Sequence, residues 1–424
     1  MLAASEDVHR PERAAQLEKL VAKAPAPAVG NRRSYGDAAL NSGGTTIDMT
    51  RLNRCLSFDP ATGEAEVEAG VTIGELLDIF APLGWMPAVL PGTGFATVGG
   101  CIANDVHGKN HHSAGSFGQH VLKMTLLTAK GLQTVTPESD PDLFRATMGG
   151  VGQTGVIASA RLQLAPCPGE LVQVEERRMD GIEEFLSCLA ASRADYSVGW
   201  IDATAKGHDL GRGILEEGTV VPGSAPSRAT PRTVPAVVPP LLVSAPVVRA
   251  FNAAYLRRVP EGGRSRHRGL AGFFFPLDRL HGWNRLYGKR GFHQFQCVLP
   301  EGAEDTLRDM LERIAASGLA SPLAVLKRLG PGRAGMMSFP MAGMTLAVDF
   351  PNRRAAEALA IELEWLAVEA GGRIYLAKDA LADPDLIARM YPDLPEFAAT
   401  LSRVDPKGVF QTDLSRRLNL RGAP

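Results

Sequence analysis

The segment Pro91–His120 reads PGTGFATVGGCIANDVHGKNHHSAGSFGQH and decides how the rest of the chain can fold. It contains seven glycines, four of the chain's nine histidines and a single carboxylate. Glycine at this density excludes a regular helix or strand over the whole segment and lets the backbone approach a ligand closely. The bare backbone N–H groups, together with Lys109, suit an anionic ligand. A glycine-rich surface loop is the plain alternative.

A second loop of similar chemistry lies upstream. Gly30–Asp37 reads GNRRSYGD and adds two arginines, a serine and two more glycines. If the two loops meet in the folded chain, their N–H groups and cationic side chains can surround a charged group such as a phosphate. This pairing favours a binding site over a plain surface loop.

Length and composition describe an ordinary globular protein. The 424 residues are too many for one core of usual size, so we expect two domains or one domain with a large insertion. A formal net charge of −1 excludes a nucleic-acid binder that works through its overall field. Five scattered cysteines without a CxxC pair argue against disulfides and a zinc site, which predicts reduced thiols and a cytoplasmic location.

No stretch of the sequence predicts a membrane-spanning helix. The N-terminal segment lacks the apolar core of a signal peptide. Between Arg232 and Arg249 lie 16 uncharged residues with four prolines, which is shorter than the roughly 20 residues that a bilayer requires. This tract could lie on a membrane surface or shield a lipid-shaped ligand, and a mobile Pro-rich loop is the alternative.

Strand, turn and helix signals lead into the glycine-rich segment. Thr45–Asp48 and Glu64–Ala69 are strand candidates, and Thr72 with Glu75 forms a capping box that predicts a helix over Gly74–Phe80. An amphipathic helix is also expected over Pro11–Ala24.

A second glycine motif follows a predicted hairpin and the predicted helix Asp140–Met148. Gly150–Gly155 reads GVGQTG and matches the dinucleotide pattern GxGxxG. That pattern requires a strand before it and a helix after it, whereas here a helix precedes and the strand Val156–Leu164 follows. We therefore reject a Rossmann site and expect these glycines to approach a cofactor closely.

The second half of the chain indicates an antiparallel α+β arrangement. A long, poorly ordered tract is expected over Glu217–Arg249, and aromatic strands over residues 271–300, including GFFFPLD and FHQFQCVLP. The remaining elements are a helix over Ile182–Ala191, helices over 301–318 and 352–370, and strands over Ala324–Lys327 and Met344–Phe350.

Several segments, in this order, resemble the FAD-binding oxidoreductases of the vanillyl-alcohol oxidase group. They are GNRRSYGD, PGTGFATVGG, HGKNHHSAGSFG, GGVGQTG and VDPKGVF. More narrowly, HGKNHHSAGSFG, FPLDRLHGWNRLYG, YLAKDA and FQTDLSRRL are similar to the decaprenylphosphoryl-ribose 2'-oxidase family, whose members are the flavin subunits of an epimerase. The resemblance runs from about Gly30 to Leu418 and is weakest over 203–260.

The resemblance implies an α+β fold with an FAD-binding PCMH-type domain of two α+β subdomains and an antiparallel-sheet substrate or cap domain. The expected boundaries are 1–165 for FAD binding, 166–385 for the cap, and 386–424 for a C-terminal segment that returns to the FAD-binding domain. By the same resemblance FAD would be lined by Arg33, Ser34, Tyr35, Gly36, Asp37, Gly92, Thr97, Val98, Gly99, Gly100, His107, Gly108, Lys109, Asn110, Ile157 and Tyr375. Many relatives attach the flavin to a histidine of the first loop; because Arg33 stands there, we expect dissociable FAD.

The resemblance also assigns the chemistry. Oxidation of a secondary alcohol needs a hydride acceptor, which flavin provides, and an acceptor for the hydroxyl proton. Lys378 is the family-matched residue beside the flavin; it is a base only when neutral, and otherwise it orients and polarises. His107 is the second expected catalytic residue. Without the resemblance, Lys378 would read as a solvated lysine at a strand end.

Gln294, Gln296, Lys327, Trp200 and Lys109 are the expected substrate-binding residues, because they match family positions that face the sugar. Amides read hydroxyl groups well, lysine suits a phosphate, and the two glutamines lie on one strand face by their spacing. From spacing alone, Gln294 and Gln296 could equally lie on a solvated strand face, and Trp200 could equally be an ordinary core tryptophan.

A metal site built from His107, His111 and His112 is the weaker interpretation. Gly108 and Lys109 oppose a helix that would bring histidines four residues apart together, and a lysine between them opposes a divalent ion. We therefore expect no metal.

Three positions depart from the family pattern. Ala347 stands where relatives carry cysteine, Thr345 where they carry asparagine, and Phe274 where tyrosine is frequent. Cysteine has no required part in hydride transfer, so turnover should survive, but inhibition that targets a cysteine should not. The other two changes bear on the exact substrate.

The resemblance predicts an FAD-dependent oxidation of the 2-hydroxyl of a polyprenylphosphoryl ribofuranose, with a short-chain NAD(P)H reductase as partner. Peripheral contact with the inner membrane is a further expectation, and no nucleic acid is expected. A soluble alditol or aldonolactone oxidase that uses oxygen is the first alternative. A metal-dependent hydrolase and a catalytically silent binding module are the others.

Overall fold

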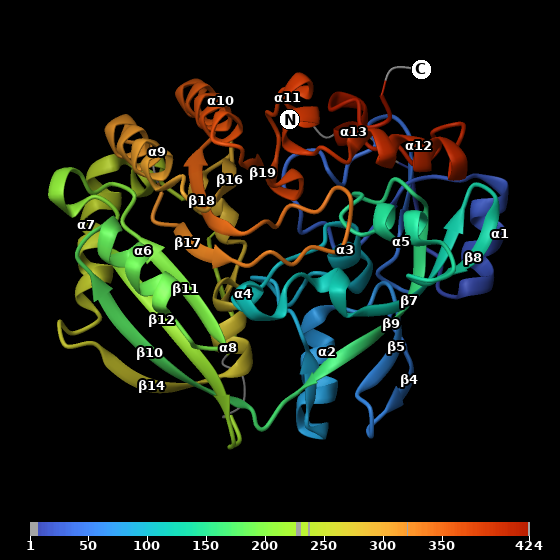
Figure 1. Ribbon diagram of the computed structural model, residues 1–424, viewed down its shortest axis with the longest axis horizontal. Coiled ribbons are helices and arrows are strands. Elements are labelled where there is room, and N and C mark those ends of the chain that lie inside the picture. Colours follow the sequence, from blue (N-terminus) through green and yellow to red (C-terminus); the bar gives the residue numbers. More distant parts are fainter. Residues whose placement is uncertain (1–6, 226–229, 236–237, 320, 423–424) are drawn as a thin grey trace.

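The computed structural model describes residues 7–225, 230–235, 238–319 and 321–422, which form two main β-sheets with helices around them (Figure 1). In the first half of the chain lie a small parallel sheet and a six-stranded antiparallel sheet. In the second half lies an eight-stranded sheet. The α+β prediction is therefore confirmed.

The small parallel sheet has the order β1-β3-β2, with strands Asp7–His9, Thr45–Asp48 and Ala28–Val29. Helix α1 (Ala14–Lys23) buries Leu17 and Val21 in a core that also contains Ile47. Strand β2 ends directly before the loop that begins at Gly30, so this sheet sets the position of the loop.

The six-stranded sheet carries the glycine-rich segment between two of its strands. Its order is β4-β5-β9-β7-β8, and β6 pairs with β9; the bounds are Cys55–Asp59, Glu64–Glu68, Val156–Pro166, Val121–Thr128, Gly131–Val135 and Trp85–Pro87. In β5, Ala65 and Val67 are fully buried and alternate with the partly exposed Glu64 and Glu66, as predicted, whereas Glu68 is buried and pairs with Arg54. The predicted capping box of Thr72 and Glu75 opens helix α2 (Ile73–Phe80).

Short helices follow α2 around the glycine-rich segment. They are α3 (Val98–Ala103), α4 (His111–Ala114) and, after the hairpin, α5 (Pro141–Thr147). Gly152 and Gly155 follow α5 and precede β9, so the helix–glycines–strand order predicted for GVGQTG is confirmed.

The eight-stranded sheet has the order β14-β10-β12-β11-β17-β18-β16-β19. Its strands are Arg264–Gly269, Leu171–Met179, Gly213–Val221, Tyr196–Ile201, Ala324–Leu329, Gly343–Pro351, Phe292–Pro300 and Arg373–Ile374. Helices α6 (Ile182–Ala191), α9 (Glu304–Ser317) and α10 (Arg354–Glu369) cover one face through a core with Phe185, Leu311 and Leu363. The other face is turned toward the first half of the chain.

Strand β16 shows how the two faces differ. Phe295 and Cys297 are buried in the core, whereas Gln294 and Gln296 point to the opposite face. The prediction that the two glutamines share a face is confirmed, because side chains alternate along a strand.

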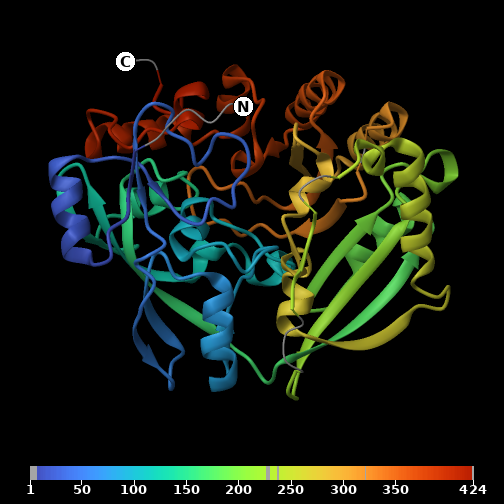
Figure 2. The same ribbon diagram turned by 180° about the vertical axis from the view of Figure 1, so that it is seen from behind.

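Two predictions for the second half are wrong. GFFFPLD does not form a strand but helix α8 (Leu270–Phe274) and a 3-10 turn, Pro276–Arg279. Phe273, Phe274 and Phe275 are all buried, and an unbroken apolar run carries no period that separates helix from strand. In Figure 2 this yellow segment runs along the junction between the two halves.

The tract Glu217–Arg249 also contains more regular structure than predicted. Glu217–Val221 completes β12, and α7 (Ala245–Arg257) begins at Ala245. Between them lie β13 (Arg232–Thr233), which pairs with β15 (Leu280–His281), and the 3-10 turn Pro240–Val243. Residues 226–229 and 236–237 of this tract lie outside the described residues.

Three C-terminal helices connect the two halves of the chain, because the first packs against α10 and the next two contact the first half. They are α11 (Pro384–Met390), α12 (Leu394–Val404) and α13 (Asp413–Arg417). Arg403 forms an ion pair with Asp140, and Gln153 donates to the Phe410 carbonyl. The domain boundaries expected at 165 and 385 stay predictions. Among the described helices, none has the length and apolar character needed to cross a membrane.

Candidate active site

A cavity of about 1400 Å³ lies between the glycine-containing loops and the open face of the eight-stranded sheet. This exceeds the roughly 300–1000 Å³ of common small-molecule sites, so it can hold more than one ligand of modest size. Residues Leu277–Asn284, which follow α8, line a third side. Asp278 fixes this side to the glycine-rich segment by accepting hydrogen bonds from Thr93 Oγ1 and the Gly94 N–H, each 2.7 Å long.

The two predicted loops meet in this cavity. A Cβ atom on Gly30 would lie 2.2 Å from Thr97 Oγ1, so this contact requires glycine. The Arg33 guanidinium lies 5.0 Å from the Phe95 ring centroid, a second contact between the loops. Tyr35 and Gly99 both line the same cavity, which confirms that the loops converge.

The cavity wall offers unpaired donors to an anion. In the part of the chain that the structure describes, the backbone N–H groups of Arg33 and Ser34 have no acceptor, and both residues line the cavity. At Gly92 no atom lies within 4 Å of the position of a Cβ, so the backbone there is open to a ligand. These donors fit the pyrophosphate of a dinucleotide cofactor such as FAD.

Most of the residues expected around FAD line the cavity, and four do not. Those that do are Arg33, Ser34, Tyr35, Gly92, Thr97, Gly99, Gly100, His107, Gly108, Lys109, Ile157 and Tyr375, with Gly152 and Gly155 of the second glycine motif. Val98 is fully buried in the core, and Asn110 donates to the Ala88 carbonyl instead. Gly36 packs on the Asp379 backbone.

Asp37, the fourth, faces away from the cavity toward the C-terminal helix α13. Both of its carboxylate oxygens accept 2.8 Å hydrogen bonds from Arg417. Arg417 also donates to Asp379, directly after Lys378, and to the Ala382 carbonyl. The sequence did not reveal this contact, because its two ends lie 380 residues apart. Asp37 therefore fixes the first loop in place.

Three side chains meet at the centre of the cavity. His107 Nε2 lies 3.1 Å from Gln296 Nε2, and its Nδ1 lies 3.4 Å from Lys327 Nζ. The ring centroid of Tyr375 is 5.8 Å from that of His107. Burial, and next to it the Lys327 charge, hold the pKa of His107 well below its usual value. The imidazole is therefore neutral.

The lysines of the site are unusually easy to deprotonate. Burial lowers the pKa of Lys378 to about 8, although the nearby Asp349 carboxylate favours the charged form. Burial, with repulsion from Lys109 and Lys378, lowers the pKa of Lys327 to about 7. Lys378 Nζ lies 4.0 Å from the Tyr35 ring centroid, so it joins the first loop to the sheet.

All the expected substrate-binding residues line the cavity: Gln294, Gln296, Lys327, Trp200 and Lys109. Gln294 donates to Asp349 over 2.5 Å, which fixes its amide. Trp200 donates its N–H to the Pro322 carbonyl, and its ring lies 4.6 Å from the Tyr255 ring. The indole ring can therefore form an apolar part of the cavity wall, but its N–H already donates to Pro322 and is not available to a ligand.

The three departures from the family pattern also lie at the cavity: Ala347, Thr345 and Phe274. Thr345 Oγ1 accepts from Gln296 Nε2 at 3.2 Å and donates to the Cys297 carbonyl at 2.8 Å. Thr345 thereby takes part in orienting Gln296. Ala347 leaves a small apolar surface beside it on the same strand.

The histidines do not assemble as metal ligands. His111 Nδ1 accepts from the Gly330 N–H, and His112 Nε2 pairs with the Ala194 carbonyl. The rings of His107 and His111 are 6.3 Å apart between centroids. Over the described residues, no group of three or more histidine, cysteine and carboxylate side chains could hold a metal ion.

One part of the cavity wall was missed by the sequence reasoning. Arg258, Arg266 and Arg268 line the cavity beyond Trp200. The signal was the RSRHRG stretch of β14, where arginines alternate as on one strand face. Their acidic partners come from distant strands, so the local sequence does not distinguish them from solvated arginines.

Comparison with known proteins adds to this geometry. A family profile described as an FAD binding domain matches residues 7–136. The chain is 39% identical over 407 residues to decaprenylphosphoryl-β-D-ribose oxidase of Mycolicibacterium smegmatis, covering 92% of this chain and 88% of that protein. It is 36% identical over 368 residues to an uncharacterized Streptomyces coelicolor protein, covering 82% and 100%. A D-arabinono-1,4-lactone oxidase of Yarrowia lipolytica is 29% identical over 143 residues, covering 32% and 27%.

Proposed function

Because this chain belongs to the decaprenylphosphoryl-β-D-ribose oxidase family of FAD-dependent oxidoreductases, within the vanillyl-alcohol oxidase group, we propose that it oxidises the 2-hydroxyl of a polyprenylphosphoryl ribofuranose to the 2-keto sugar. The observation that carries this proposal is a cavity that joins the two loops proposed to hold the pyrophosphate to a wall of lysines and glutamines. The Yarrowia lipolytica lactone oxidase matches only 32% of the chain, and a putative D-arabinono-1,4-lactone oxidase of Neurospora crassa matches 96% of it at only 22% identity. The alternative therefore has weaker support than the match at 39% identity over 92% of the chain.

When bound, FAD supplies the hydride acceptor for this oxidation. Arg33, Ser34 and Gly92 would hold its pyrophosphate through backbone donors. His107 and Tyr375 would line the flavin end of the cavity. Arg33 occupies the family's position for covalent attachment through histidine, and arginine cannot form that bond. We therefore propose that FAD is held without a covalent link.

Lys378 is the proposed acceptor of the hydroxyl proton. With a pKa of about 8, a fraction of its amines is neutral at pH 7, and only the neutral amine can take a proton at Nζ. The charged form that results can stabilise developing negative charge nearby. The neutral imidazole of His107 holds Gln296 on one side and Lys327 on the other.

The sugar hydroxyls would be read by Gln294 and Gln296. The two amides project from one face of β16 and are fixed by Asp349 and Thr345. Fixed amides lose little freedom when they bind a hydroxyl, which favours a defined sugar orientation. Trp200 would pack against the sugar ring, and Lys327 and Lys109 would contribute positive charge.

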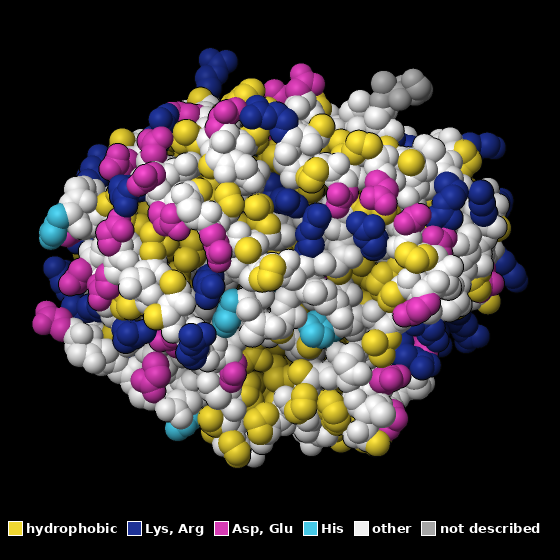
Figure 3. Space-filling model, in the orientation of Figure 1, with side chains coloured by type: hydrophobic (Ala, Val, Ile, Leu, Met, Phe, Trp, Pro, Cys, Tyr) yellow, Lys and Arg dark blue, Asp and Glu magenta, His cyan; other side chains and the backbone are white. Residues whose placement is uncertain are grey.

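The proposal includes a short-chain reductase partner that returns the keto sugar to an alcohol, which would complete an epimerisation. It also includes a cytoplasmic enzyme in peripheral contact with the inner membrane. Leu241 and Leu242 in the Pro-rich tract, and Phe251 just after it in α7, are exposed apolar side chains that support such a contact. On the face shown in Figure 3, acidic and basic side chains are interspersed, and hydrophobic side chains gather toward its lower edge.

An anaerobic reduction assay tests the proposed function. Protein loaded with FAD is mixed with farnesylphosphoryl-β-D-ribofuranose, and bleaching of the flavin absorbance is followed. Rapid bleaching with this compound, and little with free ribitol, is expected. Bleaching by ribitol with stoichiometric peroxide formation in air would favour the alditol-oxidase alternative. An unchanged flavin spectrum with the phosphorylated sugar would refute the proposal.

A further inference from the structure

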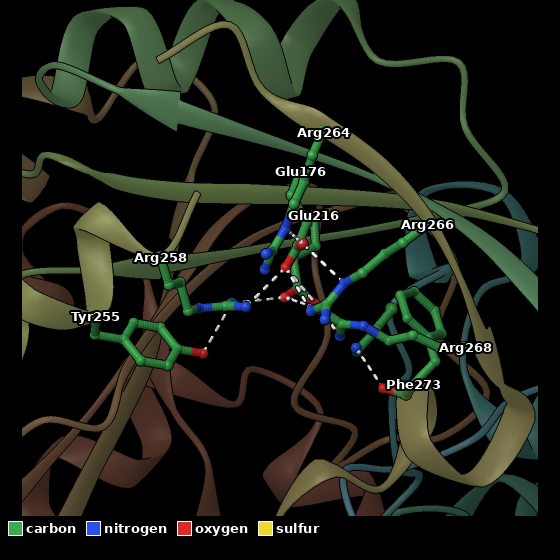
Figure 4. A network of polar contacts seen from close by, with 9 residues as sticks. Glu176, Glu216, Tyr255, Arg258, Arg264, Arg266, Arg268 and Phe273 are labelled. Atoms are coloured by element: carbon green, nitrogen blue, oxygen red, sulfur yellow. Dashed lines mark hydrogen bonds and ion pairs between the residues drawn. The ribbon is translucent and has the colours of Figure 1, made fainter. Parts of the chain in front are cut away.

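An ion-pair network lies in the wall of the cavity beside Tyr255 (Figure 4). Its centre is Glu176, which is completely buried and pairs with four arginines. Glu216 pairs with two of them. Arg258, Arg266 and Arg268 line the cavity, and we call these three the arginine cluster. Arg264 does not line it.

Strand register explains how this network forms. Glu176 on β10 lies directly opposite Glu216 on β12 in the antiparallel pair. Two neighbouring carboxylates repel one another and need cations close by. β14 flanks β10 on its other side, and its alternate residues Arg264, Arg266 and Arg268 extend toward the carboxylates. Arg258, which follows the last residue of α7, reaches Glu176 from a separate element and forms the fourth ion pair.

The network carries more positive than negative charge. Four guanidinium groups face two carboxylates, and Lys109 lies close enough to influence Glu216. Burial acts to raise the pKa of Glu216, but Lys109 and Arg268 outweigh it and lower the pKa to about 2. Glu216, which also lines the cavity, is therefore charged, and the guanidinium groups of Arg258, Arg266 and Arg268 outnumber it on the cavity wall.

Two nitrogen donors of the arginine cluster have no hydrogen-bond acceptor among the described residues. Within the described part of the chain, no acceptor pairs with Arg266 Nη1 or Arg268 Nε. Burial, and after it repulsion from Arg268, lower the pKa of Arg266, which shows that the positive groups are crowded. Positive charge that is not neutralised within the protein and lines a cavity attracts an anionic ligand.

We propose that the arginine cluster binds the phosphate group of the substrate. This inference rests on the proposed function, which requires a sugar that carries a phosphate. Guanidinium groups bind phosphate oxygens through paired hydrogen bonds, and Glu176 and Glu216 hold the three side chains in place before the ligand arrives. Lys327 lies close enough to Lys378 and Lys109 to feel their charges, and Lys109 in turn lies close to Arg268, so basic side chains connect Lys378 to the cluster.

Binding can be measured without turnover, so the test does not depend on the oxidation. Farnesyl phosphate is titrated calorimetrically into FAD-loaded protein, with farnesol as the neutral counterpart and inorganic phosphate as the headgroup alone. Arg266→Gln and Arg268→Gln should each weaken farnesyl phosphate binding roughly tenfold or more, because each removes a charge-assisted contact. Farnesol binding should not change. Inorganic phosphate should compete with farnesyl phosphate in the wild type.

Arg264→Gln is the matched control, because Arg264 contacts the same buried carboxylate from outside the cavity. It should bind farnesyl phosphate like the wild type. If a glutamine variant does not fold, Arg266→Lys and Arg268→Lys keep the charge and should still weaken binding severalfold, since lysine lacks the paired donors.

Three results would overturn the proposal: equal farnesyl phosphate affinity in the cluster variants and the wild type, no binding to the wild type, or an equal loss in Arg264→Gln. A fall in FAD affinity in the cluster variants would assign the cluster to the cofactor and would also refute it. Arginine-dependent binding without flavin reduction by farnesylphosphoryl ribose would refute the proposed function and leave the phosphate site standing.

Discussion

Replacing Arg417 by methionine removes the guanidinium that joins Asp37 of the first loop to Asp379 beside Lys378. The Arg417 side chain is 27% exposed, whereas each of the two carboxylates is only 5% exposed. Three charge-assisted hydrogen bonds of 2.8 Å are lost, and two buried carboxylates remain without their cation. Methionine keeps much of the side-chain volume, so the loss is mainly electrostatic.

The expected cost follows from that burial. Removing one partner of a buried ion pair costs about 3–5 kcal/mol, since the remaining charge is stranded. With a urea slope of about 3 kcal/mol per molar, the unfolding midpoint should fall by roughly 1–1.7 M. FAD affinity should fall as well, because Asp37 and Asp379 no longer hold the loop that contains Arg33 and the segment that contains Lys378.

The neighbouring Arg416→Met is the control. Arg416 is 43% exposed and pairs with Asp413 only three residues away, so its loss should cost about 1 kcal/mol or less. Urea unfolding followed by tryptophan fluorescence gives the midpoint, and flavin fluorescence on titration gives the FAD affinity. Equal midpoints for the two variants, or an unchanged FAD affinity in Arg417→Met, would refute the positioning role of Arg417.

Three further predictions concern the site and its support. Lys378→Met should keep FAD bound but slow its reduction by substrate at least a hundredfold in stopped flow, because no amine remains to take the proton; a normal rate would remove Lys378 from the mechanism. Gly30→Ala should weaken FAD binding at least tenfold, since its Cβ would overlap Thr97, whereas Gly262→Ala points into open space and should not. Burial, and after it repulsion from Asp379, raise the pKa of Glu364 to about 8. The folded protein therefore favours the protonated carboxyl group. This contribution to stability, a few kcal/mol, is complete below a pH of about 4.5 and is lost as the pH rises through 8. Glu364→Gln should therefore be more stable than the wild type at pH 9 and similar at pH 4, which urea midpoints at both pH values would check.

The sequence predicts a local feature correctly where the residues that determine it are close together along the chain. The density of glycine in Pro91–His120 predicted a loop that approaches a ligand, and the spacing of Gln294 and Gln296 predicted one strand face. The capping box at Thr72 fixed the start of a helix within one residue. Each of these signals spans only a few positions, so tertiary packing could not reverse it.

The misses have a common physical cause, which is that tertiary partners decide the outcome. Phe273 and its two neighbours are buried on all sides, so their run carries no helical or strand period. Asp37 was read as a cofactor ligand because its partner Arg417 is distant in sequence. The cluster at Arg266 depends on Glu176 and Glu216, which meet only through the pairing of two strands.

The clamp formed by Arg417 has a consequence for biosynthesis. Asp37 is translated 380 residues before Arg417, which takes roughly 20–80 s at about 5–20 residues per second. Throughout that interval Arg417, whose charge anchors the loop that we propose holds FAD, has not yet been synthesised. The pocket can therefore close around its cofactor only after α13 has emerged from the ribosome.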